Sequence, residues 1–375
     1  MNERRDRFRQ AMARFEPSGD PLEALSRGLY VAEPVQSVAQ QILARLELRP
    51  QSSHLVTGPI GSGKTTQLRV LERSLQEGGE FWPIFADITT HGNELQAEGL
   101  LIKHVLDDLQ KLRGQELAAG AQFTKGQGTV IAILGVLALL ATVSSSGNNG
   151  QSAAVVEKDI KQVLRTLSRK PVLLIDSLDR LSHAVFAEMC DQDLAKLREH
   201  IAIVVVAPPA IMYGAARETA ERFDYFTRQT AKDPRDDPKI RAFLTQVIRL
   251  RADEALLPET SCDHLVLASG GILRDLIALT QLALEEAYVA GHAGVEPNDV
   301  ARATDTFGRK HIIGLDSQEV STLQRVRTRG SFVRVNDSDM GLLVTRRVLE
   351  YADDRGATRF AVHPTLIPLL EQLDV

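Results

Sequence analysis

Apolar residues at helical spacing open the chain. They recur every three or four residues in two short runs, and the break between the runs is rich in proline and glycine. A third run with the same spacing ends before Pro50, a residue that cannot continue a helix. We therefore predict an N-terminal helical segment over residues 1–30 and a further helix ahead of the first strand.

Short apolar segments then alternate with amphipathic helical patterns. Buried strands are predicted at Ser53–Thr57, Phe81–Ile88, Pro171–Asp176 and Ile201–Val206. The last two are continuous apolar runs, which are typical of strands covered on both faces in a parallel sheet. Because strands and helices alternate, we predict an α/β core over residues 31–232, with helices on both faces of a parallel sheet.

The strand pattern stops after about Asp233, and four helical segments follow it. They predict an α-helical lid over residues 233–313. Residues 314–375 show a mixed pattern and predict a small C-terminal module. Its features are a segment at 344–350 that fits a helix end or a strand, a turn at 353–356, a strand at Thr358–Val362 and a closing helix at Pro364–Leu373.

The composition is that of a soluble globular protein with more than one domain. The chain has 375 residues, 43% of them hydrophobic and 25% charged, with a formal net charge of -5. This charge argues against a chain dominated by nucleic-acid binding but leaves room for a local basic patch. Cys190 and Cys262 are the two cysteines, far apart and without metal-ligand spacing. The charged N-terminus lacks the apolar core of a secretory signal, so we expect a cytoplasmic protein.

A glycine-rich segment after the first strand carries the strongest chemical signal. It matches G-x-x-x-x-G-K-[ST] in full, as Gly58-Pro59-Ile60-Gly61-Ser62-Gly63-Lys64-Thr65. Glycines let backbone N–H groups approach phosphate oxygens, and the start of the next helix favours an anion. Lys64 would reach the β- and γ-phosphates, and the Thr65 hydroxyl would ligate Mg²⁺. We predict an ATP site over residues 58–66, with Thr66 as its last residue.

A carboxylate at the end of a later strand supplies the second half of the predicted site. Asp176 ends the strand Pro171–Asp176, at the sheet edge where ligands collect in α/β folds. We expect Asp176 to bind Mg²⁺, mainly through water. Asp179 would either orient the attacking water or cap a helix. Ser177 follows Asp176 directly, where many ATPases of the additional-strand group carry a catalytic glutamate, so we expect slow hydrolysis.

These motifs resemble the AAA+ and STAND classes of P-loop ATPases. The form Asp-Ser-Leu-Asp-Arg is especially similar to the KAP family of NTPases, which carry membrane-associated insertions between the two nucleotide motifs. The resemblance spans roughly residues 31–306. It implies that Ser269-Gly-Gly-Ile-Leu-Arg274 opens a lid helix whose arginine approaches the γ-phosphate, the alternative for Arg274 being a surface salt bridge.

The resemblance also implies an oligomer and a winged-helix-like module over residues 314–375. In an oligomer, an arginine after the last strand would act on the neighbour's nucleotide, and Arg222 is our choice over Arg217 and Arg228. If this module has a function of its own, we expect it to be DNA binding. Residues 316–375 contain eight arginines and nine acids, a balance that favours packing over DNA contact.

Residues 126–156 contain no charged residue and have a continuously apolar centre. That centre is shorter than the roughly 20 residues of a membrane-spanning helix. One crossing would also separate the two nucleotide motifs, which must fold together. Three interpretations stay open: burial in a partner or oligomer, contact with a membrane surface, and a core helix. The second would place the protein at the periphery of a membrane.

The leading hypothesis is a nucleotide-driven switch that controls assembly or a separate effector protein. The resemblance to bacterial STAND and KAP proteins implies a role in anti-phage defence. A second hypothesis is a DNA-associated AAA+ ATPase for replication initiation or transposition. Further alternatives are a membrane-associated KAP-like NTPase and a scaffold that holds ATP without hydrolysing it.

Overall fold

The fold is taken from a computed structural model of the chain. It describes residues 2–17, 19–87, 100–123, 160–212, 217–333, 337–352 and 357–373. These divide into two compact units. The first comprises Met1–Gln41, Thr57–Arg69 and Thr227–Val375, and the second comprises Ile42–Val56 and Val70–Phe226.

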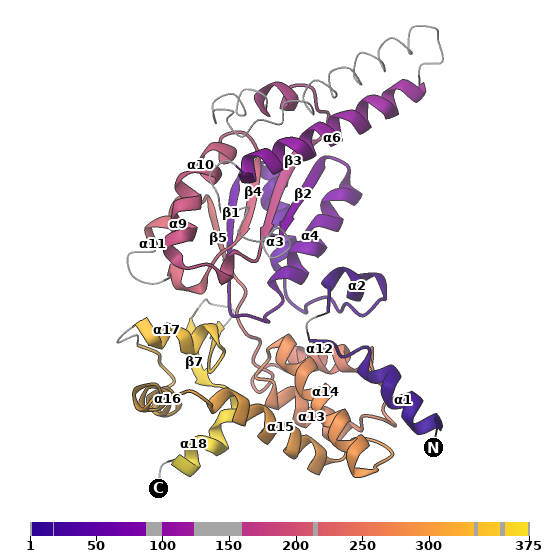
Figure 1. The fold of residues 1–375 in the computed structure, drawn as a ribbon, viewed down its shortest axis with the longest axis vertical. Helices are drawn as coiled ribbons and strands as arrows, with labels where there is room; N and C mark the ends of the chain where they lie inside the picture. Colours follow the sequence, from indigo (N-terminus) through magenta and orange to yellow (C-terminus); the bar gives the residue numbers. More distant parts are fainter. Residues whose placement is uncertain are drawn as a thin grey trace. The chain divides into compact units, whose positions relative to one another are not determined.

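A five-stranded sheet forms the α/β part of the chain (Figure 1). Its order is β2-β3-β4-β1-β5, and the pairs β2–β3, β3–β4 and β4–β1 are parallel. This confirms the predicted parallel sheet. The strands are β1 Ser53–Thr57, β2 Phe81–Asp87, β3 Lys170–Asp176, β4 Ala202–Val206 and β5 Tyr225–Arg228.

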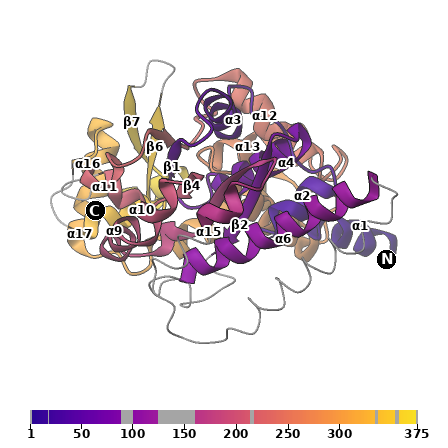
Figure 2. The ribbon, with the colours of Figure 1, turned by 90° about the horizontal axis from the view of Figure 1, so that it is seen from above.

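The sheet is buried on both faces because its strands carry apolar side chains at successive positions. One face packs on α6 (Leu100–Phe123), α9 (His183–Asp191) and α10 (Asp193–Arg198). Helices α3 (Val38–Leu48) and α4 (Lys64–Gly78) lie on the side opposite α6 (Figure 2). The short α11 (Arg217–Ala220) precedes β5.

Four amphipathic helices build the lid around a second core. They are α12 Pro238–Arg249, α13 Glu259–Ala268, α14 Leu273–Ala290 and α15 Pro297–Ile312. The N-terminal helix α1 (Asn2–Met12) joins this core through Phe8 and Ala11. Arg4 donates to backbone carbonyls at the end of α14, where a cation is favoured. A second short helix, α2, covers Pro21–Ser26.

The C-terminal module combines helices with an antiparallel hairpin. Its elements are α16 Ser317–Arg329, α17 Asp337–Val344, β6 Val348–Ala352, β7 Thr358–Val362, the 3-10 turn η5 Pro364–Leu366 and α18 Ile367–Leu373. The ambiguous segment 344–350 is therefore a helix end followed by a strand. The predicted turn at 353–356 lies outside the described residues.

Strand β5 was not predicted, and Arg228, expected after the last strand, lies within it. Tyr225–Arg228 is short and only partly buried, which weakens its apolar pattern. The apolar insertion at 126–156 falls outside the described residues. Among the helices that the structure describes, none is long and apolar enough to cross a membrane.

Candidate nucleotide site

The glycine-rich segment forms a loop between β1 and α4, and its glycines have backbone angles that other residues rarely adopt. Gly61 and Gly63 have φ values of 85° and 98°, in the left-handed region. Helix α4 begins at Lys64, so its first N–H groups face the loop. The loop and the helix start together provide the donors that a phosphate group needs.

The Lys64 ammonium is held at the loop. Its Nζ donates to the carbonyl oxygens of Gly58 and Pro59, both at 2.9 Å, and the residue is buried. Carbonyl acceptors offset the desolvation of an ammonium but do not neutralise its charge. Lys64 therefore brings a positive charge to the same loop that presents the backbone donors.

Gln229 supports the loop from the residues after β5 and was missed by the sequence reasoning. Its backbone N–H donates to Thr57 at 2.7 Å, and its Nε2 donates to the Ser62 carbonyl at 3.3 Å. A Cβ on Gly58 would lie 2.2 Å from the Gln229 carbonyl oxygen, so glycine is required there by close approach. Gln229 therefore contacts the loop at its start, beside Thr57 and Gly58, and again at Ser62.

The buried carboxylate of Glu33 holds the Gln229 side chain in place. Its Oε1 accepts hydrogen bonds from the amides of Gln67 at 3.0 Å and Gln229 at 2.9 Å. Its other oxygen lies 3.4 Å from Lys232, and the Glu33 side chain is 4% exposed. Gln67 lies on α4, so one carboxylate links the segment before the sheet, the loop helix and the residues after β5.

Arg274 lies beside the loop. It is the second residue of α14, its backbone N–H donates to the Gly61 carbonyl at 3.2 Å, and its side chain is half-buried. A Cβ on Gly61 would lie 2.7 Å from the Arg274 Cβ. The structure therefore brings together the predicted loop and the predicted lid arginine. The sharp turn before α14 uses Gly270 and Gly271, both left-handed.

Asp176 and Asp179 belong to the other unit. Asp176 is buried at the end of β3, in register with Asp87 on β2, and its Oδ1 accepts from the Ser177 N–H at 2.8 Å. Ser177 has a φ of 68°, which is uncommon for a residue other than glycine. Asp179 is half-buried in the 3-10 turn η2 (Leu178–Arg180), whose N-cap position is held by Ser177.

Each of the two residues predicted to bind Mg²⁺ offers an oxygen donor of the kind that this ion prefers. Thr65 offers a hydroxyl from the first turn of α4, and Asp176 offers a carboxylate at the end of β3. Mg²⁺ prefers such oxygen ligands and takes few of them from the protein when phosphates and waters complete the shell. Within the described part of the chain, no group of three or more His, Cys, Asp or Glu could hold a metal by itself.

The arginines considered for a trans-acting role have partners within the chain. Arg222 forms an ion pair with Asp191, and Arg217 lies 3.7 Å from Glu221. Arg228 pairs with Glu350 of the C-terminal module. The segment after β4 continues through Ala207 and two prolines, as expected from the sequence, and offers no polar side chain there.

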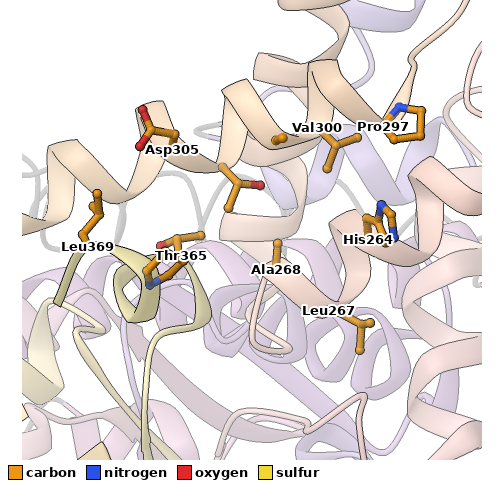
Figure 3. Close-up of a pocket in the computed structure, with 11 residues that line it drawn as sticks. His264, Leu267, Ala268, Pro297, Val300, Asp305, Thr365 and Leu369 are labelled. Carbon is orange, nitrogen blue, oxygen red and sulfur yellow. The ribbon is translucent and has the colours of Figure 1, made fainter. Parts of the chain in front are cut away.

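A separate open groove of about 490 Å³ lies in the first unit, between the lid and the C-terminal module (Figure 3). It contains none of the predicted site residues. It is lined by His264, Leu267, Ala268, Pro297, Val300, Ala301, Thr304, Asp305, Thr365, Pro368 and Leu369. These residues come from α13, α15, η5 and α18, so the groove follows the seam where the module packs on the lid.

Residues 47–212 match the family model of the AAA domain. The matched stretch contains β1, the glycine-rich loop and β3, and therefore both nucleotide motifs. No curated protein matches the chain.

Several solved structures are similar to the chain at low identity. Cdc6p from Pyrobaculum aerophilum has 15% identity and a TM-score of 0.47, over 96% of this chain and 98% of that chain. ORC2 from Aeropyrum pernix has 12% identity and a TM-score of 0.46, over 92% and 95%. The RuvB Holliday junction branch migration motor from Thermotoga maritima has 14% identity and a TM-score of 0.43, over 92% and 98%.

Proposed function

We propose that the chain binds ATP with Mg²⁺, hydrolyses it slowly, and uses the nucleotide state as a switch. The observation that carries this proposal is the loop from Gly58 to Thr65. It combines left-handed glycines, a buried lysine and a helix that begins at that lysine. This arrangement concentrates backbone donors and one positive charge on a single anion.

Each predicted residue receives a role in this proposal. Lys64 stabilises the β- and γ-phosphates, while Thr65 and Asp176 hold Mg²⁺, which would neutralise charge on the phosphates. Asp179 orients the attacking water. Water adds to the γ-phosphorus as the bond between this phosphorus and the β-phosphate oxygen breaks, giving ADP, inorganic phosphate and a proton that leaves to solvent. Arg274 approaches the γ-phosphate from the lid and couples the lid to the nucleotide.

Slow turnover follows from the residue after Asp176. Ser177 cannot accept a proton from water as a glutamate would, and its left-handed backbone is fixed next to the Asp176 carboxylate. A site that binds ATP well but cleaves it slowly spends most of its time in one nucleotide state. That property suits a switch better than a motor.

Two variants test the chemistry. Lys64→Ala is expected to abolish ATP binding or hydrolysis, because the loop loses its positive charge. Asp176→Ala is expected to remove Mg²⁺-dependent turnover. Equilibrium binding of a fluorescent ATP analogue and phosphate release with and without Mg²⁺ would measure both. Unchanged ATP binding by the Lys64→Ala variant would overturn the assignment of the site, and tight ATP retention without turnover would favour a scaffold.

We extend the proposal to the whole chain. Its parts are an N-terminal segment at 1–30, an ATPase core at 31–232, a lid at 233–313 and a winged-helix-like module at 314–375. The STAND-like and KAP-like motifs support a homo-oligomeric switch that signals to a separate effector, in bacterial anti-phage defence. This role is tested by expressing the chain with its neighbouring genes in bacteria and challenging them with phage. The Lys64→Ala variant, expressed in the same way, is the control.

DNA association is the second candidate function, and one feature of the module favours it. Helix α16 ends in Arg327 and Arg329, and a helix and a hairpin follow, an order that resembles a winged helix. Arg329 is exposed, while Arg327 lies 2.7 Å from Glu371. DNA-stimulated hydrolysis with a steep dependence on salt would support this function. Hydrolysis that does not respond to DNA would argue against it.

A further inference from the structure

Two neighbouring arginines of the C-terminal module contact two different helices of the lid. Arg346 lies in the turn between α17 and β6 and pairs with Asp275 of α14. Arg347 donates to the carbonyls of His311 and Ile313 at the end of α15, at 2.7 and 3.1 Å. Of these contacts, only that of Arg346 reaches the turn of α14 that carries Arg274.

The Arg346–Asp275 contact has the geometry of a strong ion pair. Nε and Nη2 of Arg346 donate to the two carboxylate oxygens at 2.8 and 2.9 Å, and the side chains are 14% and 1% exposed. Two parallel hydrogen bonds fix direction as well as distance. Asp275 is therefore oriented from the module.

The backbone of Arg346 suggests that the side chain is needed at that position. Its φ of 64° is left-handed, where an arginine is less stable than a glycine. Surrounding structure must hold such a residue, and outliers of this kind collect at functional contacts. The same residue makes the ion pair to Asp275.

The turn before α14 is held by the same module. The Tyr351 hydroxyl of β6 donates to the Gly270 carbonyl at 2.9 Å. A Cβ on Gly270 would lie 2.3 Å from a Leu349 methyl group, and a Cβ on Gly271 would lie 1.7 Å from the Lys232 carbonyl oxygen. The turn is therefore enclosed by β6 and by the residues after β5, with little room to move.

We propose that Arg346 is a positioning residue of the nucleotide site. By orienting Asp275 it fixes the first turn of α14, and it thereby sets where Arg274 stands relative to the loop at Gly61. The inference rests on the proposed role of Arg274 at the γ-phosphate. It makes the C-terminal module part of the device that distinguishes ATP from ADP, because ADP lacks the group that Arg274 would contact.

The test compares affinities for two nucleotides rather than activity. Dissociation constants for fluorescent ATP and ADP analogues are measured for the wild type and for Arg274→Met, Arg346→Met and Arg347→Met. We expect Arg274→Met to weaken ATP relative to ADP about tenfold, the scale of one charge-assisted contact. Arg346→Met should also weaken ATP binding relative to ADP binding. The double variant Arg274→Met/Arg346→Met should lose no more ATP preference than Arg274→Met alone.

Arg347→Met is the matched control. It removes an adjacent arginine that also joins module to lid, and it should leave the ATP-to-ADP ratio unchanged even if it lowers the melting temperature. A folded Arg346→Met protein with the wild-type ratio would overturn the inference. If Arg346→Met does not fold, Arg346→Lys decides, since it keeps the charge but loses the paired hydrogen bonds. A wild-type ratio in that variant would equally overturn the inference.

The outcomes separate this inference from the proposed function. If neither nucleotide binds the wild type, the proposed function fails. If Arg274→Met keeps the wild-type ratio, the role of Arg274 fails, and the inference fails with it. If Arg274→Met changes the ratio and Arg346→Met does not, the inference fails by itself.

Discussion

Glu33 accepts a hydrogen bond from Gln229 at 2.9 Å although 196 residues separate them in the chain. The same carboxylate oxygen accepts from Gln67 on the loop helix. A buried acid that lies outside the predicted nucleotide motifs therefore joins the helix after the glycine-rich loop to the residues after β5. Gln229 in turn donates to the Ser62 carbonyl, so the acid is connected to the glycine-rich loop through one side chain.

Replacing this acid by its amide should weaken the support. In Glu33→Gln the amides of Gln67 and Gln229 lose a charged acceptor, and one of them can face the N–H groups of the new glutamine. We therefore expect the free energy of unfolding to fall by about 1–3 kcal/mol. ATP affinity should fall as well. Urea unfolding followed by circular dichroism measures the first effect, and nucleotide titration measures the second.

Glu23→Gln provides the matched control. Glu23 pairs with Arg27 on an exposed helix surface of the same unit, at 2.9 Å with side chains 62% and 42% exposed. Exposed pairs of this spacing contribute only about 0.3–0.5 kcal/mol. Equal losses in the two variants would mean that Glu33 has no special role behind the loop.

Gly61 should tolerate alanine poorly. Its φ of 85° is unfavourable for a side chain, and the new Cβ would lie 2.7 Å from the Arg274 Cβ. The variant must therefore push α14 away from the loop, which should reduce ATP affinity more than ADP affinity if Arg274 contacts the γ-phosphate. Nucleotide titration of Gly61→Ala measures this difference.

Gly28→Ala separates backbone strain from the steric clash. Gly28 has a similar left-handed φ of 68°, but a Cβ there would meet nothing within 4 Å. The control should lose about 1 kcal/mol of stability and keep wild-type nucleotide affinity. A Gly61→Ala protein that binds both nucleotides like the control would contradict the contact between loop and lid.

The sequence predicted the parts of the site that are contiguous in the chain. The loop from Gly58 to Thr65 is a local motif, and Asp176 ends a strand whose apolar run is unambiguous. Ser53–Thr57 and Thr358–Val362 were predicted at their observed bounds. Local pattern sufficed in these cases because one short segment carries the whole signal.

The support of the site could not be predicted, because it depends on long-range packing. Gln229 follows a strand of only four residues, too short for a clear alternating pattern, and Glu33 lies in an irregular segment before α3. Arg346 pairs with Asp275 across 71 residues. Nothing in the residues around Arg346 distinguishes it from Arg347, and only their different partners in the fold separate the two.

Acid should destabilise the sheet through His54. This residue of β1 is fully buried, its Nε2 lies 2.8 Å from the Ser52 hydroxyl, and its ring stacks on Tyr225. Burial, reinforced by the charge of Arg45, lowers the pKa of His54 from 6.5 to about 4. Between these values the unfolded chain binds a proton that the folded chain does not, so stability falls as the pH falls.

The size of this effect can be measured by substitution. Complete titration of His54 would remove about 3 kcal/mol, and the loss should begin below pH 6.5. In His54→Gln the decline between pH 6.5 and 4 should be shallower than in the wild type, measured by urea unfolding at a series of pH values. Parallel curves for the two proteins would contradict the assignment to His54.

The apolar insertion at residues 126–156 has three candidate environments, and we predict that a partner or a second copy of the chain buries it. A segment that is apolar on all sides needs cover on all sides, and its centre is shorter than the roughly 20 residues of a spanning helix. Deleting residues 126–152 should therefore lower the molar mass measured by light scattering in the presence of ATP. The nucleotide site should keep its affinity, because both motifs lie outside the deletion.

Flotation with liposomes, compared between the intact and deleted proteins, tests the alternative. Flotation of the intact protein only, with unchanged molar mass, would replace partner burial by contact with a membrane surface.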